Sequence, residues 1–313
     1  MCIFINLIIL IRYIDHKDID KIKWDNCIDH SINGIIYAYS WYLDAVCKEW
    51  GALVEDNYVG VMPLPINRKY GVNYIYHPFF AQQLGVFSIH PLTQENIQNF
   101  LSTIPPKFKF IEQNLNTSNL FSISGVQVKN NLTHELGLNP PYEKLYKSFS
   151  DNIKRNIKKA EKEGVQVSLN ISGKEVINLF KKNKGKEVSN LSGKDYIRLE
   201  HLINTCLKKG KAQVWGVKTT KNELCAGVIF IQSHGKVIYF VSASNDKGKS
   251  SGAMAFLVNS FIKENATKDL VLDFEGSNDL NLARFYKSFG SKERVYLFIK
   301  RNNLPKIIRF IKK

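Results

Sequence analysis

The sequence has few cysteines, and their positions suggest neither a metal site nor a disulfide framework. Its five cysteines are odd in number and widely scattered, at Cys2, Cys27, Cys47, Cys206 and Cys225. No C-x-x-C pair and no cysteine–histidine pair occurs at the spacing of zinc ligands. We therefore expect reduced thiols, a cytoplasmic protein and no metal cofactor.

Long apolar runs are also missing. The most apolar stretch, MCIFINLIILIR at residues 1–12, is too short to span a bilayer. It lacks the basic segment and the small-residue cleavage site of a signal peptide. We therefore expect no transmembrane helix and at most a peripheral membrane contact.

Acidic residues are scarce beside basic ones: 28 Asp and Glu stand against 44 Lys and Arg, a net charge of +16. Such an excess favours an anionic partner such as a phosphate-bearing co-substrate, RNA or a membrane surface; DNA is not expected. A general bias toward Lys, Asn and Ile is the alternative explanation. The cations cluster on the predicted helix 142–164, where Arg155 and Lys158 are candidates for contacting an anion and a solvated face is the alternative. A basic helix is also predicted over residues 304–313.

A chain of 313 residues is long for one hydrophobic core. Both halves have helices followed by a meander of strands and then a helix and a strand, and Pro140 and Pro141 mark a boundary. This order predicts an α/β (α+β) protein of two domains, residues 1–140 and 141–313. Each domain is expected to contain a mixed, mostly antiparallel sheet flanked by helices, with residues 295–300 closing the second sheet.

Residues 270–290, LVLDFEGSNDLNLARFYKSFG, form the segment most indicative of a site. An apolar strand precedes a break at Gly276, and a helix then begins at Asn278 or Asp279 and ends at Gly290. Period-two alternation places Asp273 and Glu275 on one face of the strand. Ligands of open α/β sheets collect at the carboxyl ends of strands, so we interpret this segment as the floor of a site. Helix capping is the alternative role for Glu275.

A polar stretch before the predicted helix 253–263 is a candidate for binding phosphate. Glycine, serine and lysine side chains there suit close approach of a pyrophosphate to backbone N–H groups. The candidate residues are Lys247, Gly248, Lys249, Ser250, Ser251 and Gly252. A plain flexible loop is the alternative.

These motifs in this order resemble the GNAT acyltransferase fold. Residues 146–167 and 273–290, together with residues 62–88, resemble the FemAB-like branch of that superfamily, which carries two such domains in tandem. The resemblance implies an acyl-CoA, such as acetyl-CoA, as acyl donor. It also implies that Tyr286, four residues before Gly290, protonates the leaving group. Lining of the core or cleft is the alternative role for this tyrosine.

The same resemblance assigns roles to the other candidates. Glu275 would be the base or the anchor of the acceptor ammonium, and Asp273 would orient the acceptor. Backbone N–H groups of Val241 and Ser242 would hold the acyl oxygen. Four residues of the first half, Tyr76, Phe80, Gln82 and Gln83, would line the acceptor site together with Tyr74 and Phe79, with core packing as the alternative.

Three functions remain open from the sequence. The first is transfer of an acyl group from acyl-CoA to an amine on a small molecule or cell-envelope precursor. The second is transfer of an amino acid from aminoacyl-tRNA to a peptidoglycan precursor, as in well-studied FemAB members. The positive charge favours this reaction, whereas residues 173–210 are too short for the long helical arm of those members. The third is a binding protein that keeps the fold without catalysis.

Overall fold

The structure is a computed structural model that describes residues 10–69, 71–183, 185 and 191–305. Most of the apolar stretch at residues 1–12 and of the basic helix predicted at 304–313 lies outside the described residues. The described part divides into two compact units, residues 1–131 with 295–313, and residues 132–294. The chain passes between them within strand β7 (Gln127–Gly137) and again within strand β13 (Lys292–Asn302). A separate acyltransferase-like domain in each half stays a prediction.

The first unit contains a sheet in the order β1-β2-β3-β4-β6-β13, with β5 added beside β3. Its pairs are antiparallel except β4 with β6. The elements are β1 (Ile11–Ile14), η1 (His16–Asp18), α1 (Lys21–His30), η2 (Ile36–Ala38), α2 (Ser40–Val46), β2 (Glu49–Glu55), β3 (Gly60–Lys69), β4 (Val72–Ile75), β5 (Phe87–Ser88), α3 (Gln94–Thr103) and β6 (Phe110–Asn114).

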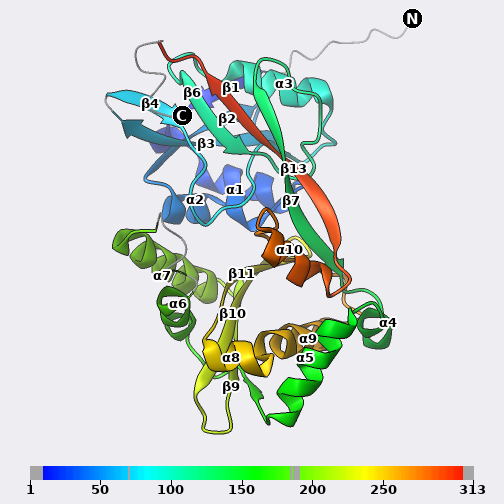
Figure 1. Cartoon of the computed structure of the whole chain (residues 1–313). Helices are drawn as coiled ribbons and strands as arrows, with labels where there is room; N and C mark the ends of the chain where they lie inside the picture. The colour runs from blue at the N-terminus through cyan, green and yellow to red at the C-terminus, as the bar shows by residue number, and fades with distance from the viewer. Residues whose placement is uncertain (1–9, 70, 184, 186–190, 306–313) are drawn as a thin grey trace, which may run out of the picture. The chain divides into compact units, whose positions relative to one another are not determined.

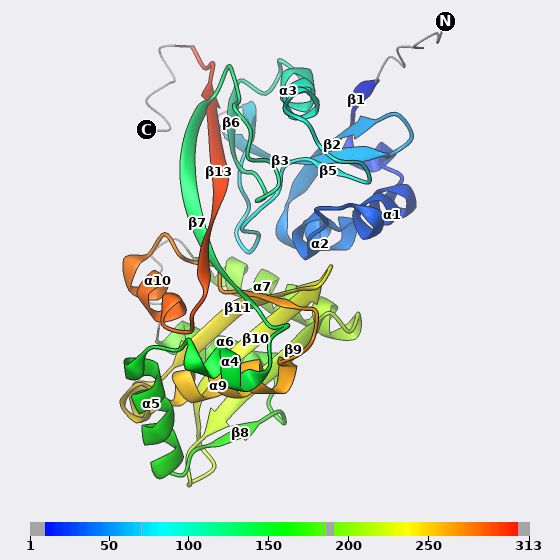
Figure 2. The ribbon, with the colours of Figure 1, turned by 90° about the vertical axis from the view of Figure 1, so that its right-hand side faces the viewer.

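The strand predicted at residues 295–300 is present as part of β13. It neighbours β7 in the sheet order, and it also pairs with β6, Phe298 opposite Asn114, a partner from the first half that was not predicted. Strand pairing is non-local, so an alternating sequence predicts a strand without identifying its neighbour. Helix α3 covers one face of the first unit's sheet, and α1 and α2 cover the other (Figure 2).

The second unit contains a sheet in the order β7-β12-β11-β10-β9-β8. All neighbours are antiparallel except β11 with β12. The elements are α4 (Tyr142–Lys147), α5 (Asp151–Lys162), β8 (Gln166–Ser168), α6 (Gly173–Lys182), α7 (Gly193–Lys208), β9 (Ala212–Lys218), β10 (Leu224–Ser233), β11 (Lys236–Ser244), α8 (Asp246–Ser251), α9 (Ala253–Asn265), β12 (Val271–Asp273) and α10 (Leu280–Lys287). The mixed, mostly antiparallel sheet flanked by helices is therefore confirmed.

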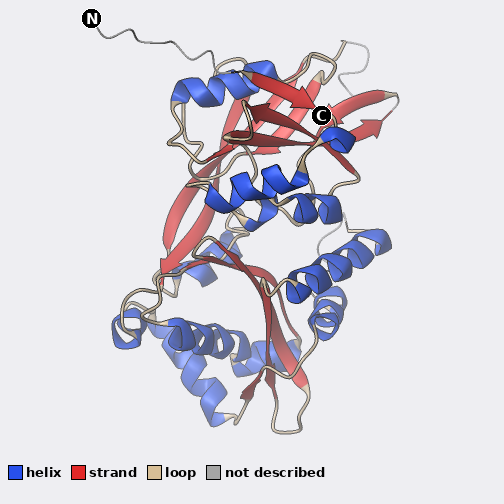
Figure 3. Cartoon of the chain, turned by 180° about the vertical axis from the view of Figure 1, so that it is seen from behind, coloured by secondary structure: helices blue, strands red, loops and turns tan. Residues whose placement is uncertain are grey.

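Helices cover both faces of this sheet. Helices α6 and α7 lie on one face, and α5, α8 and α9 lie on the other (Figures 1 and 3). On the second face the rings of Phe230 and Phe261 stack with centroids 3.8 Å apart, and Trp215 packs edge-on against both. No helix in the described ranges is long and apolar enough to cross a membrane.

The helix predicted over residues 142–164 is two helices, α4 and α5. Ser150 interrupts it, because its side chain accepts a hydrogen bond from the N–H of Ile153 and so starts a new helix. The predicted apolar stripe is confirmed, and all five of its residues are buried: Leu145, Phe149, Ile153, Ile157 and Ala160. The cationic face of α5 is exposed, as predicted.

Residues 246–252, predicted as a phosphate-binding loop with a plain flexible loop as the alternative, form helix α8 and a tight corner into α9. Asn245 caps α8 by accepting a hydrogen bond from the N–H of Gly248 at 2.9 Å. A Cβ on Gly248 would lie 2.1 Å from the carbonyl oxygen of Cys225 in β10, so glycine lets α8 approach the sheet. Gly252 turns the corner at φ +79°.

Gly248→Ala should therefore destabilise the second unit, by about 2 kcal/mol or more, because backbone atoms must move to admit one methyl group. Gly193→Ala at the start of α7 is the matched control, since nothing lies within 4 Å of the added Cβ. Urea unfolding of both variants measures the free-energy differences. Equal stabilities would contradict the close packing of α8 on β10.

Candidate functional site

The candidate site lies where strands β11 and β12 part. Their parallel ladder covers only three pairs and ends with Ile238 opposite Asp273. Beyond that point β11 continues along β10, with a bulge at Phe240, because Ile229 pairs with Val241 and Phe230 with Tyr239. Bulges of this kind occur often beside active sites. Val241 and Ser242 thus lie on a strand edge that β12 has left.

Asp273, at the end of β12, is buried and already paired. One carboxylate oxygen accepts hydrogen bonds from the Thr133 hydroxyl and from the N–H of Glu275. The other lies 3.2 Å from the ammonium of Lys236, which also pairs with Glu135. Burial lowers the pKa of Lys236, but the attraction of Asp273 and Glu135 outweighs this and raises it. Both oxygens thus have partners within the protein, and the predicted contact of Asp273 with an acceptor stays a prediction.

Glu275 follows the end of β12 and does not continue the strand as predicted. Its φ of +51° is left-handed, and Gly276 follows at +57°, so the chain turns sharply here. Left-handed backbone is unfavourable for a glutamate. The residue is half-buried, and its Oε1 is fully covered without a hydrogen-bond partner in the described part of the chain. A carboxyl group in this setting is unusual unless it acts on something else.

The surroundings of Glu275 are aromatic. The ring of Phe274 stacks on Tyr286 at 4.9 Å, and Tyr239 packs edge-on against Tyr286 at 5.8 Å. The Tyr286 hydroxyl lies beside the turn, 3.6 Å from the position that a Cβ on Gly276 would occupy. The structure therefore brings together the two predicted catalytic residues, Glu275 and Tyr286.

This environment shifts both groups toward their neutral forms. Loss of solvation raises the pKa of Glu275 to about 8. Burial also raises the pKa of Tyr286 well above its ordinary value, with further contributions from Tyr239 and from the Glu275 carboxyl. Near neutral pH a carboxyl with this pKa can take up or release a proton, and the tyrosine stays a proton donor.

Two residues of this site were missed from the sequence. His134 in β7 and Ser277 in the turn are both buried, and the histidine Nδ1 lies 2.8 Å from the serine hydroxyl. They are 143 positions apart in the sequence. Single Ser and His residues carry no local signal, and only the pairing of β7 with β12 brings these two together.

The predicted phosphate-binding residues do not form an open glycine cradle. The Cβ position of Gly248 is filled by β10, and that of Gly252 lies 2.5 Å from the Asn156 carbonyl oxygen in α5. Lys247 pairs with Glu163 at 3.2 Å, and Ser251 is buried. Both glycines thus serve close packing within the protein, and the phosphate-binding role of these residues stays a prediction.

The remaining candidates lie on other elements. Arg155 is exposed on α5. In the first unit, Gln83 is buried, with its amide bonded to the N–H of Thr117 and to Gln82. Phe80 has a left-handed φ of +68°, and its carbonyl oxygen accepts a hydrogen bond from Tyr42. Tyr76 is half-buried beside Tyr74. Gln83 is therefore engaged internally, and the acceptor-binding role of all four stays a prediction.

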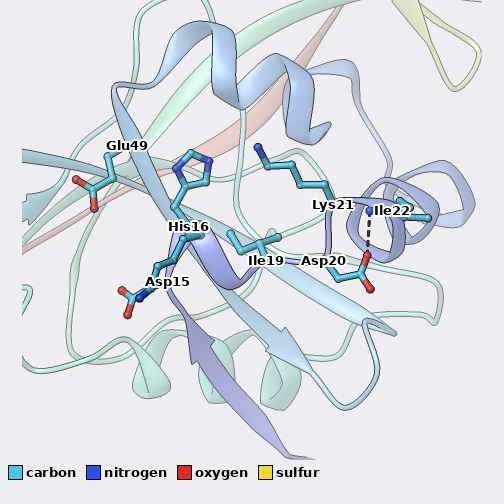
Figure 4. A pocket seen from close by; sticks show the side chains of 8 residues that line it. Asp15, His16, Ile19, Asp20, Lys21, Ile22 and Glu49 are labelled. Atoms are coloured by element: carbon cyan, nitrogen blue, oxygen red, sulfur yellow. Dashed lines mark hydrogen bonds between the residues drawn. The ribbon is translucent and has the colours of Figure 1, made fainter.

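The first unit also carries a surface hollow beside η1 and the start of α1 (Figure 4). His16 and Lys21 lie there, and both are bonded to Asp44, at 3.0 and 2.7 Å. These two side chains of the hollow are therefore already engaged by one carboxylate. In the described ranges, no three His, Cys, Asp or Glu residues are grouped so that they could hold a metal ion.

Because the Glu275 pKa is raised on folding, the folded protein binds more protons than the unfolded chain between about pH 4.5 and 8. Its free energy of unfolding should fall as pH rises through this range. Glu275→Gln removes the titration, so its stability relative to wild type should increase by up to about 1.4 kcal/mol per pH unit. Urea unfolding at several pH values tests this, with Glu264→Gln, on the exposed side of α9, as control. A difference independent of pH would contradict the burial of this carboxyl.

No family model and no curated protein matches the sequence. Solved structures do match: FemX aligns with a TM-score of 0.68 at 14% identity, covering 94% of this chain and 99% of FemX. A conserved protein of unknown function from Bacteroides thetaiotaomicron aligns at 0.56 and 10% identity, covering 93% and 99%. L-PGS from Bacillus licheniformis aligns at 0.50 and 10% identity, covering 84% and 87%. At these identities the likeness establishes the fold alone: the chain has the fold of FemX, and the resemblance to the FemAB-like branch is confirmed for the fold.

Proposed function

We propose that this chain is an acyltransferase that passes an activated acyl group to an amine acceptor, with Glu275 acting on the amine. One observation carries the proposal: a carboxyl oxygen that is buried, unpartnered and held in a left-handed turn where β11 and β12 part. A site of this kind recognises an ammonium group or removes its proton. The FemX-like fold is consistent with this chemistry.

The chemistry follows from the two titratable groups. An amine enters as ammonium, and the Glu275 carboxylate binds it and accepts its proton, which a pKa of about 8 allows near neutral pH. The free amine then attacks the acyl carbon. Tyr286, kept protonated by burial, donates a proton to the leaving group as its bond to the acyl carbon breaks, and the tyrosinate regains a proton from the acylated nitrogen. Backbone N–H groups at Val241 and Ser242 are our candidates for holding the oxyanion.

The acyl donor is the open part of the proposal. Acetyl-CoA or a similar acyl-CoA remains our first candidate, although residues 246–252 supply no glycine cradle for it. Aminoacyl-tRNA is the second candidate, and the net charge of +16 favours it. Helices α6 and α7, of 10 and 16 residues, are too short for the long helical arm, which argues against this donor. A small-molecule or cell-envelope-precursor amine remains the proposed acceptor.

Binding of acetyl-CoA by calorimetry is the first test of the donor. Substitutions at Gly252 would disturb packing as well as binding, because any side chain there meets the α5 backbone. Lys249→Glu changes charge at an exposed position and should weaken acyl-CoA binding by about tenfold if the α8 region contacts phosphate. Binding of charged tRNA but not acetyl-CoA would select the second donor. Binding of neither would favour a binding protein without catalysis.

Glu275→Gln tests the reaction once a donor and an amine are found. The substitution keeps shape and removes the base, so kcat/KM should fall about 100- to 10,000-fold. Tyr286→Phe should lower kcat with little change in the KM for the amine. Both variants are compared with wild type across pH 6–9 in a labelled-acyl transfer assay. Full activity of Glu275→Gln would contradict the proposed role.

A further inference from the structure

The backbone of Glu275 needs external support. A non-glycine residue in left-handed backbone costs about 1 kcal/mol or more, and an unpartnered buried carboxyl oxygen adds a further cost. Such strain persists only where surrounding contacts over-determine the conformation. The groups that hold Glu275 in this position are therefore part of how the site works.

Both peptide groups of Glu275 are held by side chains. Its N–H donates to a carboxylate oxygen of Asp273 at 3.1 Å, and its carbonyl oxygen accepts from the Ser277 hydroxyl at 3.0 Å. Asp273 is in turn fixed by Thr133 and Lys236. The amide side of the turn is thus anchored by a buried ion pair, and the carbonyl side is anchored by Ser277.

Ser277 is itself fixed by His134. The serine has one hydroxyl proton and two neighbours, the Glu275 carbonyl oxygen and the His134 Nδ1 at 2.8 Å. A carbonyl oxygen only accepts, so the hydroxyl donates to it and Nδ1–H of the histidine donates to the hydroxyl. The main chain adds to this connection, because the N–H of Phe274 donates to the His134 carbonyl oxygen at 2.9 Å.

The second ring nitrogen of His134, Nε2, differs from Nδ1 in its surroundings. Nε2 of His134 is buried without a hydrogen-bond partner within the described ranges, and its nearest charged atom is Oε1 of Glu293 at 3.8 Å. Lys287 lies 3.7 Å from the same carboxylate oxygen. Burial lowers the pKa of His134, with an opposing contribution from Glu293. A neutral ring with its proton on Nδ1 satisfies these contacts.

We propose that His134 and Ser277 are positioning residues that hold Glu275 in its left-handed turn and keep its carboxyl oxygen Oε1 buried. The proposal rests on the proposed function only for its effect on catalysis. The histidine acts through the serine, and the serine acts through the Glu275 carbonyl group. Neither residue needs to touch the substrate.

Ser277→Ala and His134→Leu remove this support in two ways. Without this support the Glu275 side chain can move into solvent, so the pKa of its carboxyl should be at least about one unit lower than in wild type. His134→Asn is the rescue variant, because its amide N–H occupies a place similar to Nδ1–H and should restore most of the wild-type titration. Ser260→Ala is the matched control, since that hydroxyl bonds only a carbonyl oxygen within α9.

The measurement is carbon NMR of protein labelled at the glutamate side-chain carboxyl, titrated from pH 4 to 9. The Glu275 signal is assigned by its loss in Glu275→Gln, and circular dichroism confirms that each variant is folded. A lower Glu275 titration in Ser277→Ala and His134→Leu, but not in Ser260→Ala or His134→Asn, supports the proposal. Unchanged titration in folded Ser277→Ala overturns it, whatever happens in His134→Leu.

Transfer kinetics separate this proposal from the proposed function. If Glu275 is the base, kcat/KM at pH 7 should fall about tenfold or more in Ser277→Ala and recover in His134→Asn relative to His134→Leu. A shifted titration without transferase activity in wild type would retain the positioning role and reject the acyltransferase. Wild-type kinetics with a shifted titration would reject Glu275 as the catalytic group and leave its support in place.

Discussion

The connection between the turn after β12 and strand β7 is the constraint on which the candidate site depends. Phe274 and Ser277 are both bound to His134, by main-chain and side-chain contacts respectively. The first bond extends the β12–β7 pairing by one residue, and the second holds the left-handed turn that follows through Ser277. In this turn Oε1 of Glu275 is covered and has no hydrogen-bond partner in the described part of the chain.

Most other polar groups near the site are bonded within the protein, and this distinguishes Glu275 from them. Asp273 balances Lys236 in a buried pair, whose loss on one side would leave an uncompensated charge. Gly248 and Gly252 are required by packing against β10 and α5. Glu275 Oε1, in contrast, remains without a partner within the described part of the chain. The candidate site is therefore centred on a group that the fold holds but does not satisfy.

The same internal contacts bear on the identity of the acyl donor. A glycine-rich segment suggested a cofactor loop, but its glycines serve close packing of helices. The fold shared with FemX is compatible with amine acylation yet does not choose among donors, because one fold can carry several chemistries. In the proposed reaction Glu275 acts on the amine of the acceptor, and Tyr286 acts on the leaving group of the donor. Every acyl donor of this class has such a leaving group.

The sequence by itself determined the local elements: the apolar stripe of α4 and α5 and the cap at Asp279. These depend on side-chain periodicity and capping within a few residues. Only the tertiary structure decided that β13 pairs with β6, that residues 246–251 are helical and that His134 meets Ser277. Such contacts join distant segments, and no local pattern encodes them. The raised pKa of Glu275 belongs to the same group, because desolvation is created by packing rather than by neighbours in sequence.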